Sequence, residues 1–546
     1  MNLLQDPWMP VRDAQGRRNW IAPDRLAEAQ WRAFDADRPD FNGALAQFAI
    51  GLLQTTTPVA DSIEWRELFR VPPDADTLRA WFAPVAQAFD LDGDGPRFMQ
   101  DLGLATEAGK SSAIAELLIE APGEATLTSN RDFFVKRNIV TVMCAPCAAT
   151  AALTLQINAP EGGRGHFTGM RGGGPLTTLV WVNGDAPLWT NLWLNIADQS
   201  TRLRPPGDEP TGSLQLSFPW LGLVEALQPP GGSLTSAQVN SMHAYWAMPR
   251  RIRLDFIALE RETTCNVCNR NANPAVTHFR SRPNGLNYPS IAWIHPLSPY
   301  RSKDGTWLPT RPNPSTRGHR QWLAWTLATG TSIDRCASVV SMVLTGRARQ
   351  FRTGLNLWTF GFEMRKDKAV SWHEANLPLF ALTDCSDEQQ RHIKAEIGRW
   401  LDAAALAGSY LRGAVKDAWF SADARGDLSH VDASFWAATE APFYRQLQAL
   451  IGAARDGTEH AALPAREAWH RALIRAALHL FDHAFVGAGA IERQNPRRIA
   501  LAHKQLRGSL HGPKLRLALG LPTDAPAKRP ARKSAVSPTQ SPQEAA

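Results

Sequence analysis

Hydrophobic and polar positions follow two patterns along the chain, and the change falls near residue 380. Before it, short apolar runs alternate with Gly, Pro and Asn. The longest interruptions are 160–175, 205–210 and 309–314. This pattern predicts an α+β fold for residues 1–380, a large irregular mixed domain with long loops. Its predicted strands include 176–182 and 252–257, and its predicted helices include 42–54 and 321–329.

After residue 380, Ala, Leu, Glu, Arg and Gln dominate and aromatics recur at intervals. Apolar residues of one segment return every three or four positions: Trp469, Leu473, Ala476, Ala477, Leu480 and Phe481. This spacing puts them on one face of a helix. Four helices are predicted, over 386–420, 434–456, 464–486 and 495–519. Together they predict a C-terminal four-helix bundle over residues 381–520.

Composition narrows the class of protein. Residues 521–546 are rich in Pro, Ala, Ser and Lys, which is typical of a disordered tail. The 546-residue chain has no run of 18 apolar residues and no charged-then-apolar leader, so we expect a cytoplasmic protein outside the membrane. Its net charge of +7 favours a polyanionic partner without requiring one.

Four of the six cysteines form two Cys-x-x-Cys pairs, Cys144 with Cys147 and Cys265 with Cys268. Two such pairs complete the four-sulfur shell that zinc favours. The 117 residues between the pairs exclude a local zinc ribbon. We therefore predict a structural zinc site that clamps two distant loops of one domain. A redox dithiol at the first pair and two unrelated pairs are the alternatives. Cys336 and Cys385 are predicted to be free thiols.

The sequence does not nominate a catalytic site. Residues 103–111 resemble a phosphate-binding loop but have five residues between the glycines where the motif has four. Met143 precedes the first cysteine pair where a zinc deaminase needs Pro. The segment 372–374, Trp-His-Glu, is interpreted as the edge of a domain. We expect a protein that is not an enzyme.

Three loops have residues suited to nucleic acid. Residues 161–174 contain seven glycines with Arg164 and Arg171, so backbone and guanidinium groups can approach phosphates or bases. Residues 130–138 place two aromatics among basic and amide side chains, which suits base stacking. Residues 364–369 form a polar turn after an apolar run. A flexible connector, buried phenylalanines and an ordinary turn are the respective alternatives.

These features together resemble a known family, the CasA family, which is the large subunit of the type I-E CRISPR Cascade complex. The resemblance rests on the opening residues 1–11, the two cysteine pairs, residues 171–178 and residues 293–299, in the family's order and spacing. It covers about residues 1–520.

The resemblance implies a DNA-recognition subunit that does not cut. Such a subunit reads the protospacer-adjacent motif of double-stranded target DNA in the minor groove and wedges the duplex open. The guide RNA, held by the crRNA-containing Cascade subunits, then pairs with the freed strand to form an R-loop. A helicase-nuclease is recruited afterwards. This activity is part of antiviral defence.

The resemblance also assigns DNA-binding residues. They are Phe133, Phe134, Val135 and Lys136 in one loop; Gly162, Gly163, Arg164 and Gly165 in the glycine loop; Arg280 and Arg282 in a basic finger; and Asp367, Lys368 and Ala369 in the wedge. Three positions depart from the family pattern. Arg164 interrupts a stretch that can be all glycine, Arg replaces Lys in the finger, and Lys368 stands where Gln can occur.

Two other functions stay open. One is a zinc-containing, metal-dependent nucleic-acid enzyme whose catalytic residues were not recognised. The other is a zinc-stapled scaffold without DNA contact. In the leading interpretation, one zinc ties the bases of three DNA-reading loops together and holds them in register.

Overall fold

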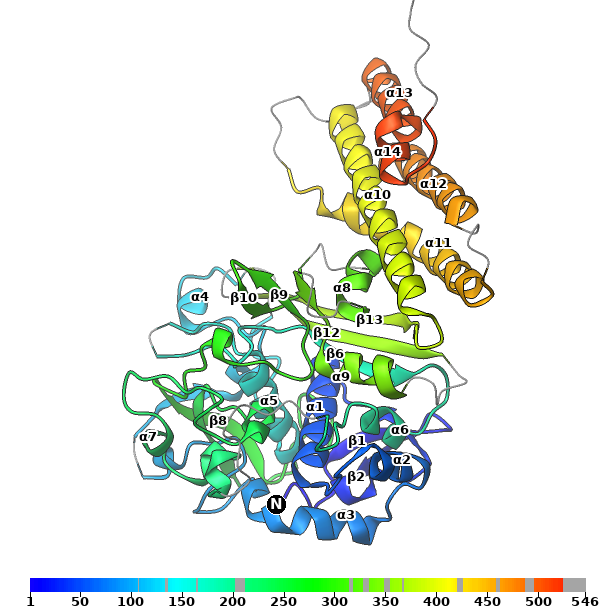
Figure 1. The fold of residues 1–546 in the computed structure, drawn as a ribbon. Coiled ribbons are helices and arrows are strands. Elements are labelled where there is room, and N and C mark those ends of the chain that lie inside the picture. The colour runs from blue at the N-terminus through cyan, green and yellow to red at the C-terminus, as the bar shows by residue number, and fades with distance from the viewer. Residues whose placement is uncertain are drawn as a thin grey trace, which may run out of the picture. The chain divides into compact units, whose positions relative to one another are not determined.

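The computed structural model describes residues 1–106, 108–132, 136–163, 165–201, 212–313, 318–327, 333–347, 354–365, 368–419, 426–457, 462–486 and 495–523 (Figure 1). The chain divides into two compact units. The first combines Met1–Ala395 with Trp436–Gly457, and the second combines Glu396–Phe435 with Thr458–Ala546. The predicted boundaries at 380 and 520 stay predictions. The predicted tail lies outside the described residues from 524 onward.

Helix α1 (Pro39–Thr56) lies in the core of the first unit. Pro begins the helix, where the missing N–H costs no hydrogen bond. Most of its side chains are buried, as expected of a helix surrounded by protein. The Phe48 ring meets Trp8 and Trp246 edge-on, with centroids 5.0 and 5.9 Å apart. The prediction of a helix over 42–54 is confirmed.

The first unit also contains eight shorter α-helices among the described residues. They are α2 (Ser62–Arg70), α3 (Ala75–Phe82), α4 (Glu124–Thr128), α5 (Ala145–Asn158), α6 (Leu188–Trp193), α7 (Val224–Leu227), α8 (Trp322–Thr326) and α9 (Ser338–Met342). Helix α8 is the predicted helix of 321–329, and it ends at Thr326.

Small antiparallel sheets make up the β-structure of the first unit. One has the order β2-β1-β3, from β1 (Met9–Asp13), β2 (Arg18–Ile21) and β3 (Trp31–Phe34). A second has the order β4-β8-β5 with β7 also paired to β8, from β4 (Lys110–Ala113), β5 (Met143–Cys144), β7 (Arg251–Ile257) and β8 (Ala275–Arg282). A third has the order β10-β9-β11, from β9 (Tyr300–Lys303), β10 (Thr306–Pro309) and β11 (Asp334–Arg335).

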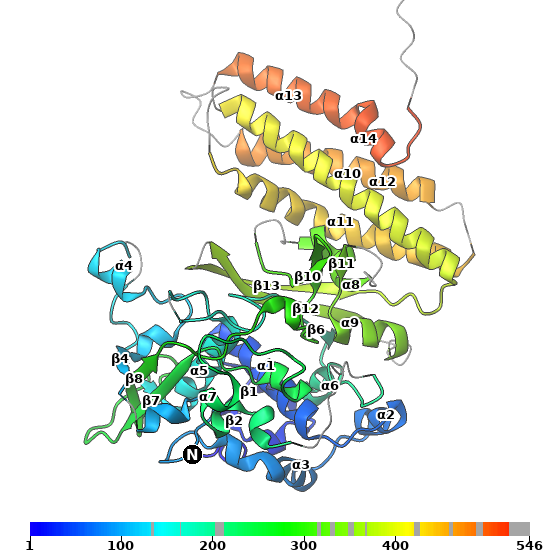
Figure 2. The same ribbon diagram turned by 60° about the vertical axis from the view of Figure 1, so that its left-hand side comes forward.

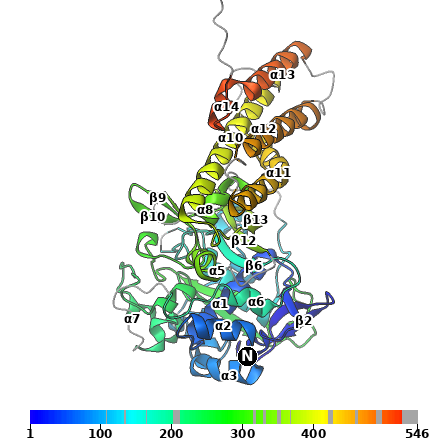
Figure 3. The same cartoon turned by 45° about the vertical axis from the view of Figure 1, so that its right-hand side comes forward.

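The fourth sheet has the order β13-β12-β6 and lies against α1 (Figures 1 and 3). Its strands are β6 (Thr177–Val182), β12 (Leu355–Arg365) and β13 (Lys368–Leu379). A Cβ on Gly43 of α1 would lie 2.7 Å from the ring of Phe360, so only glycine admits β12 this closely. Strands β6 and β7 confirm the two strands predicted over 176–182 and 252–257.

Long helices follow β13. They are α10 (Asp387–Trp419), α11 (Ser429–Arg455), α12 (Ala462–His479), α13 (Pro496–His511) and the short α14 (Pro513–Ala518), all near the C-terminus (Figure 1). A π-helical turn over Leu480–Phe485 follows α12. The prediction of one uninterrupted helix over 495–519 is therefore wrong. The break falls at Gly512 because Pro513, which has no N–H to donate, begins the next helix.

The described helices of the second unit are joined by specific polar contacts. The indole of Trp469 on α12 donates to the carbonyl of Trp400 on α10 at 3.0 Å. His470 Nε2 lies 2.8 Å from the carbonyl oxygen of Leu510 on α13. The mixed α+β class is confirmed. None of the described helices combines the length and the apolar character needed to cross a lipid bilayer.

Candidate metal centre and nucleic-acid interface

The first cysteine pair spans the junction between a strand and a helix. Cys144 ends β5, where it pairs with Ala275 of β8, and it is also the N-cap of α5. Pro146 in the first turn favours the start of the helix, and Cys147 follows within the same turn. Both cysteines are therefore held by regular secondary structure, Cys144 by β5 and Cys147 by the first turn of α5.

The second pair lies in a tight turn. The amide of Cys265 donates to the carbonyl of Arg270 at 2.8 Å, and the amide of Asn269 donates to the carbonyl of Cys265 at 3.0 Å. Asn269 has a φ of 57°, a left-handed conformation that Asn tolerates better than most residues. The turn brings Cys265 and Cys268 to the same side.

Asn266, between the two cysteines of the second pair, binds this turn to the segment that leads into β5. Its Oδ1 accepts from the amides of Thr141 and Val142, at 2.8 and 2.9 Å. The backbone N–H of Asn266 donates to the carbonyl of Val142 at 2.9 Å. The two cysteine segments are thus held together by backbone contacts as well as by their sulfur atoms.

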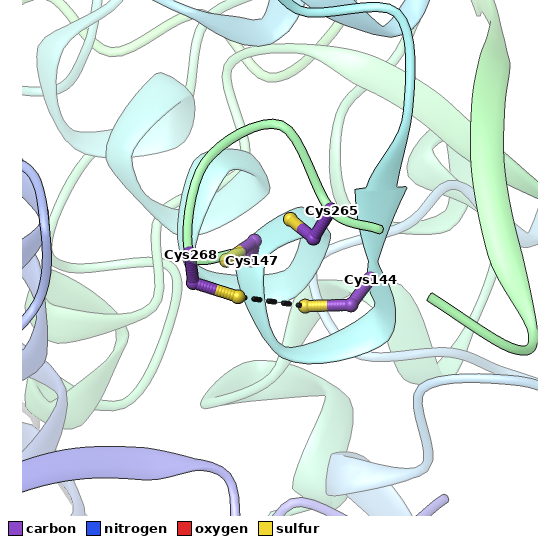
Figure 4. Close-up of side chains that lie close together, drawn as sticks. All are labelled: Cys144, Cys147, Cys265 and Cys268. Carbon is purple, nitrogen blue, oxygen red and sulfur yellow. Dashed lines mark hydrogen bonds between the residues drawn. The ribbon is translucent and has the colours of Figure 1, made fainter. Parts of the chain in front are cut away.

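The four sulfur atoms lie within 4.8 Å of one another, with Cys144 and Cys268 Sγ 3.6 Å apart (Figure 4). Four thiolates around zinc, with bonds of about 2.3 Å, would be about 3.8 Å apart. Hydrogen bonding with Cys144 lowers the pKa of Cys265 and raises the pKa of Cys147. The spacing and the donor set fit a tetrahedral metal ion. The predicted gathering of the two pairs is confirmed, and the identity of a metal is not.

The glycine loop, here residues 161–166, forms a compact turn. The amide of Gly162 donates to the carbonyl of His166, and the amide of His166 donates to that of Gly163, both at 3.0 Å. Gly163 and Gly165 have φ values of 89° and 78°, which favour glycine. No described atom lies within 4 Å of where a Cβ of Gly163 would stand, so the turn is open there. Arg164 lies outside the described residues.

The proposed finger lies at the end of β8, next to the glycine loop. The amide of Asn284, just past the strand, donates to the carbonyl of Gly165 at 2.7 Å. Arg280 pairs with Asp255 at 3.0 Å and donates to the carbonyl of Leu104 at 2.8 Å, so it is held within the unit. Arg282 is half-buried at the last position of the strand.

The proposed wedge lies at the end of the β12–β13 hairpin, and Asp367 is outside the described residues. Exposed Lys368 begins β13, and its ammonium group donates to Thr126 of α4 at 3.3 Å. Figure 2 shows α4 on the side of the unit toward which this end of the hairpin points. Ala369 follows it and is half-buried. The hairpin end is thus next to the segment that leads into the 130–138 loop. There, Phe133, Phe134 and Val135 lie outside the described residues, and Lys136 is exposed.

One residue of the glycine segment does not match its predicted role. Arg171 is buried and bonded inside the protein, where it donates to Thr177 at 3.0 Å and to Ser298 at 2.8 Å. Burial lowers its pKa to about 10. The expectation that Arg171 meets phosphate or base edges is therefore wrong, because its guanidinium joins the glycine segment to the core. The position of Asn266 was also missed, because an Asn within a turn carries no distinctive sequence signal.

Comparison with solved structures defines the class of fold. CasA (Cse1) from Thermus thermophilus superposes with a TM-score of 0.64 at 18% identity, covering 93% of this chain and 99% of that chain. Cse1 from Acidimicrobium ferrooxidans gives 0.63 at 17% identity, covering 95% and 98%. A chain of a CRISPR RNA-guided surveillance complex gives 0.66 at 17% identity, covering 94% and 99%. The fold is that of these CRISPR-associated proteins.

The family described as CRISPR-associated protein Cse1 matches residues 2–480. The chain therefore belongs to the Cse1 family, also called CasA. The family resemblance that was drawn from its sequence motifs is confirmed.

Proposed function

We propose that this Cse1-family chain is the large, non-catalytic subunit of a type I-E Cascade complex and that it recognises target DNA. In this role it reads the protospacer-adjacent motif in the minor groove, wedges the duplex open beside it and recruits the helicase-nuclease after the R-loop has formed. A structure similar to this chain is named as a CRISPR RNA-guided surveillance complex, which supports assembly with crRNA-containing subunits. The cytoplasm is the proposed location of this assembly.

The observation that carries the proposal is a continuous path from the cysteine cluster to the glycine loop. Cys144 pairs with the first residue of β8, and β8 runs to Arg282. Two residues further on, Asn284 bonds to Gly165. A rigid path of this kind suits recognition, because loops that read DNA must be held to within a fraction of an ångström by the elements beneath them.

The cysteine cluster is proposed to hold zinc as a structural ion. Cys144, Cys147, Cys265 and Cys268 supply the four sulfur ligands that fill a tetrahedral zinc shell and leave no open position for substrate. The metal would therefore supply folding free energy. The long C-terminal helices are proposed to form a four-helix bundle that contacts the rest of the complex and the bound DNA.

The proposed DNA contacts are residues 133–136, the glycine loop at 162–165, Arg280 and Arg282 in the finger, and residues 367–369 at the hairpin end. An exposed lysine at the hairpin end suits a phosphate contact beside an opened duplex, since Lys acts on phosphate as a point charge. The minor groove carries a degenerate code, so several related motifs should be accepted.

The test is a binding assay on the complex assembled with crRNA, using target duplexes with a randomised motif. We expect enrichment of a few motifs, and Lys368→Glu should weaken target binding about tenfold or more. Lys303→Glu, the same charge reversal on exposed Lys303 of β9, should have little effect. Equal affinity for all motifs, or equal binding without this chain, would exclude the proposal.

A second arm addresses the alternative of a metal-dependent nucleic-acid enzyme. The complex should leave target DNA intact in divalent metal until the helicase-nuclease is added. Cleavage by the complex and metal alone would favour the enzyme instead. A scaffold without DNA contact predicts that charge reversal at Lys136, Arg282 and Lys368 leaves target affinity unchanged.

A further inference from the structure

Arg250 lies directly beneath the glycine loop and is fixed there by its backbone. Its amide donates to Oε1 of Gln156 on α5 at 3.0 Å, and its carbonyl accepts from Nε2 of the same side chain at 2.9 Å. Its guanidinium then reaches the start of the loop, where Nη2 donates to the carbonyl of Pro160. Two hydrogen bonds from one buried glutamine thus place this arginine with respect to α5.

The guanidinium also packs against the loop backbone. A Cβ on Gly162 would lie 2.6 Å from Nη1 of Arg250 and 2.8 Å from Cβ of His166, so a side chain there would displace the guanidinium from the loop or shift His166. At the other end of the loop, Gly165 is held by Asn284. The loop is therefore anchored on both sides, and Gly163 at its centre faces open space among the described residues.

The charge of Arg250 is not neutralised by a carboxylate among the described residues. Its neighbour Arg251 pairs with Asp101 at 2.5 Å and with Glu225 at 2.6 Å. Burial lowers the pKa of Arg250 to about 10, which leaves it charged at neutral pH. The pKa of His166 in the loop is also lowered, first by burial and then by the positive charge of Arg250. The loop therefore lies in a positive field.

Arg250 is half-buried, and a guanidinium without a carboxylate partner keeps an attraction for anions that an ion-paired guanidinium largely loses. The guanidinium contacts the glycine loop at Pro160 and Gly162, and the backbone of that loop can approach another molecule closely. A polyanion that reaches the loop would supply the missing negative charge. Phosphates lining a narrow groove have this chemistry.

We propose that Arg250 is a positioning residue for the glycine loop, whose guanidinium fixes the loop backbone and adds a charge that attracts the sugar-phosphate backbone of the duplex. This inference rests on the proposed function, because it assumes that the loop meets DNA. In this inference Arg250 does not contact a base. Arg250 affects which motif is chosen only because it fixes the position of Gly162.

The experiment compares variants in the complex assembled with crRNA, measured for affinity toward duplexes with and without the preferred motif. Arg250→Gln should lower the ratio of the two affinities about tenfold, as loss of a charged hydrogen bond does. Arg250→Lys should restore much of the overall affinity and its salt dependence, because it keeps the charge. It should not restore the ratio of the two affinities, because an ammonium group cannot both donate to Pro160 and pack on Gly162 as a planar guanidinium does.

The matched control is Arg253→Gln. Arg253 lies on β7, is buried, and has no ion pair among the described residues; its bonds go to the carbonyls of Gly93 and Gly95, at 3.4 and 3.3 Å. Loss of this guanidinium should lower thermal stability and leave the affinity ratio unchanged. Gly162→Ala should reduce the ratio by itself and add little to Arg250→Gln, because both changes disturb one contact.

The outcomes separate the inference from the proposed function. If the unmodified complex binds target no better than a complex lacking this chain, the proposed function fails. If the unmodified complex reads a motif but Arg250→Gln lowers the ratio no more than Arg253→Gln does, the inference alone fails. Full additivity of Gly162→Ala with Arg250→Gln would also overturn it.

Discussion

Replacement of Cys265 by serine tests whether the four cysteines act as one metal clamp. The change removes one of four sulfur ligands and leaves the turn around it otherwise similar. Zinc binds a three-sulfur site with a serine hydroxyl far less tightly, so the link between the two cysteine pairs should open. We expect about one zinc per chain in the unmodified protein and loss of most of it in Cys265→Ser.

The size of the effect follows from the length of the loop that the clamp closes. About 120 residues separate the two pairs, and closing a loop of this length in the unfolded chain corresponds to about 5 kcal/mol of chain entropy. The first unit has roughly 400 residues, so its unfolding entropy is on the order of 0.9 kcal/mol per degree. The expected fall in Tm is therefore about 5 °C, and strain or metal bound to the unfolded chain would reduce it.

The assay combines elemental analysis with thermal unfolding before and after chelation. Cys385→Ser is the matched control, because Cys385 is also buried in the first unit and has no partner thiol. It should keep its zinc and lose less stability. The clamp is refuted if the unmodified protein is fully folded without zinc, or if both serine variants lose the same stability and keep the same metal content.

Two further predictions concern buried ionisable groups. His243 is fully buried against Tyr288, and burial lowers its pKa from 6.5 to about 4. The unfolded chain therefore takes up this proton first as the pH falls. His243 should contribute a loss of roughly 3 kcal/mol in stability between pH 6.5 and 4, and His243→Asn should reduce the slope of stability against pH in urea titrations. In the second unit, Glu396 is buried and paired with Arg466, so Arg466→Met should cost about 3 kcal/mol or more, whereas Arg471→Met at an exposed pair should change Tm little. An unchanged slope, or equal losses in the two arginine variants, would contradict them.

The helices were the most predictable part of the fold. The segment 42–54 became α1 and 386–420 became α10, because each has a long uninterrupted pattern that needs few distant partners to define it. Helix ends were less predictable. Helix α11 begins at Ser429, five residues before the predicted start, and retains Pro442 within it. Local pattern alone does not report how far tertiary packing extends a helix.

The long hairpin was the main feature that the sequence concealed. Strand β13 alternates between exposed and half-buried positions over much of its length, so it lacks the clear apolar alternation of a strand with one buried face. The segment 372–374, which was interpreted as the edge of a domain, lies within β13 and pairs with β12. The Glu374 carboxylate accepts from the indoles of Trp358 and Trp372, at 2.9 and 3.0 Å. The contact from Trp358 joins β12 to β13, so it exists only when the two strands are paired.

In the candidate site, too, some residues could be predicted from the sequence and others could not. The two cysteine pairs could be identified because metal chemistry demands the same ligands at the same spacing in any fold, and the structure brings them together. Residues that position the loops gave no such signal. The side chains of Asn266 and Arg250 bond to backbone groups 125 and 90 positions away in the chain, so their roles depend on the tertiary fold rather than on any neighbouring residue. It follows that substitutions at these two positions should disturb recognition although no predicted metal ligand or DNA-contact residue is itself replaced.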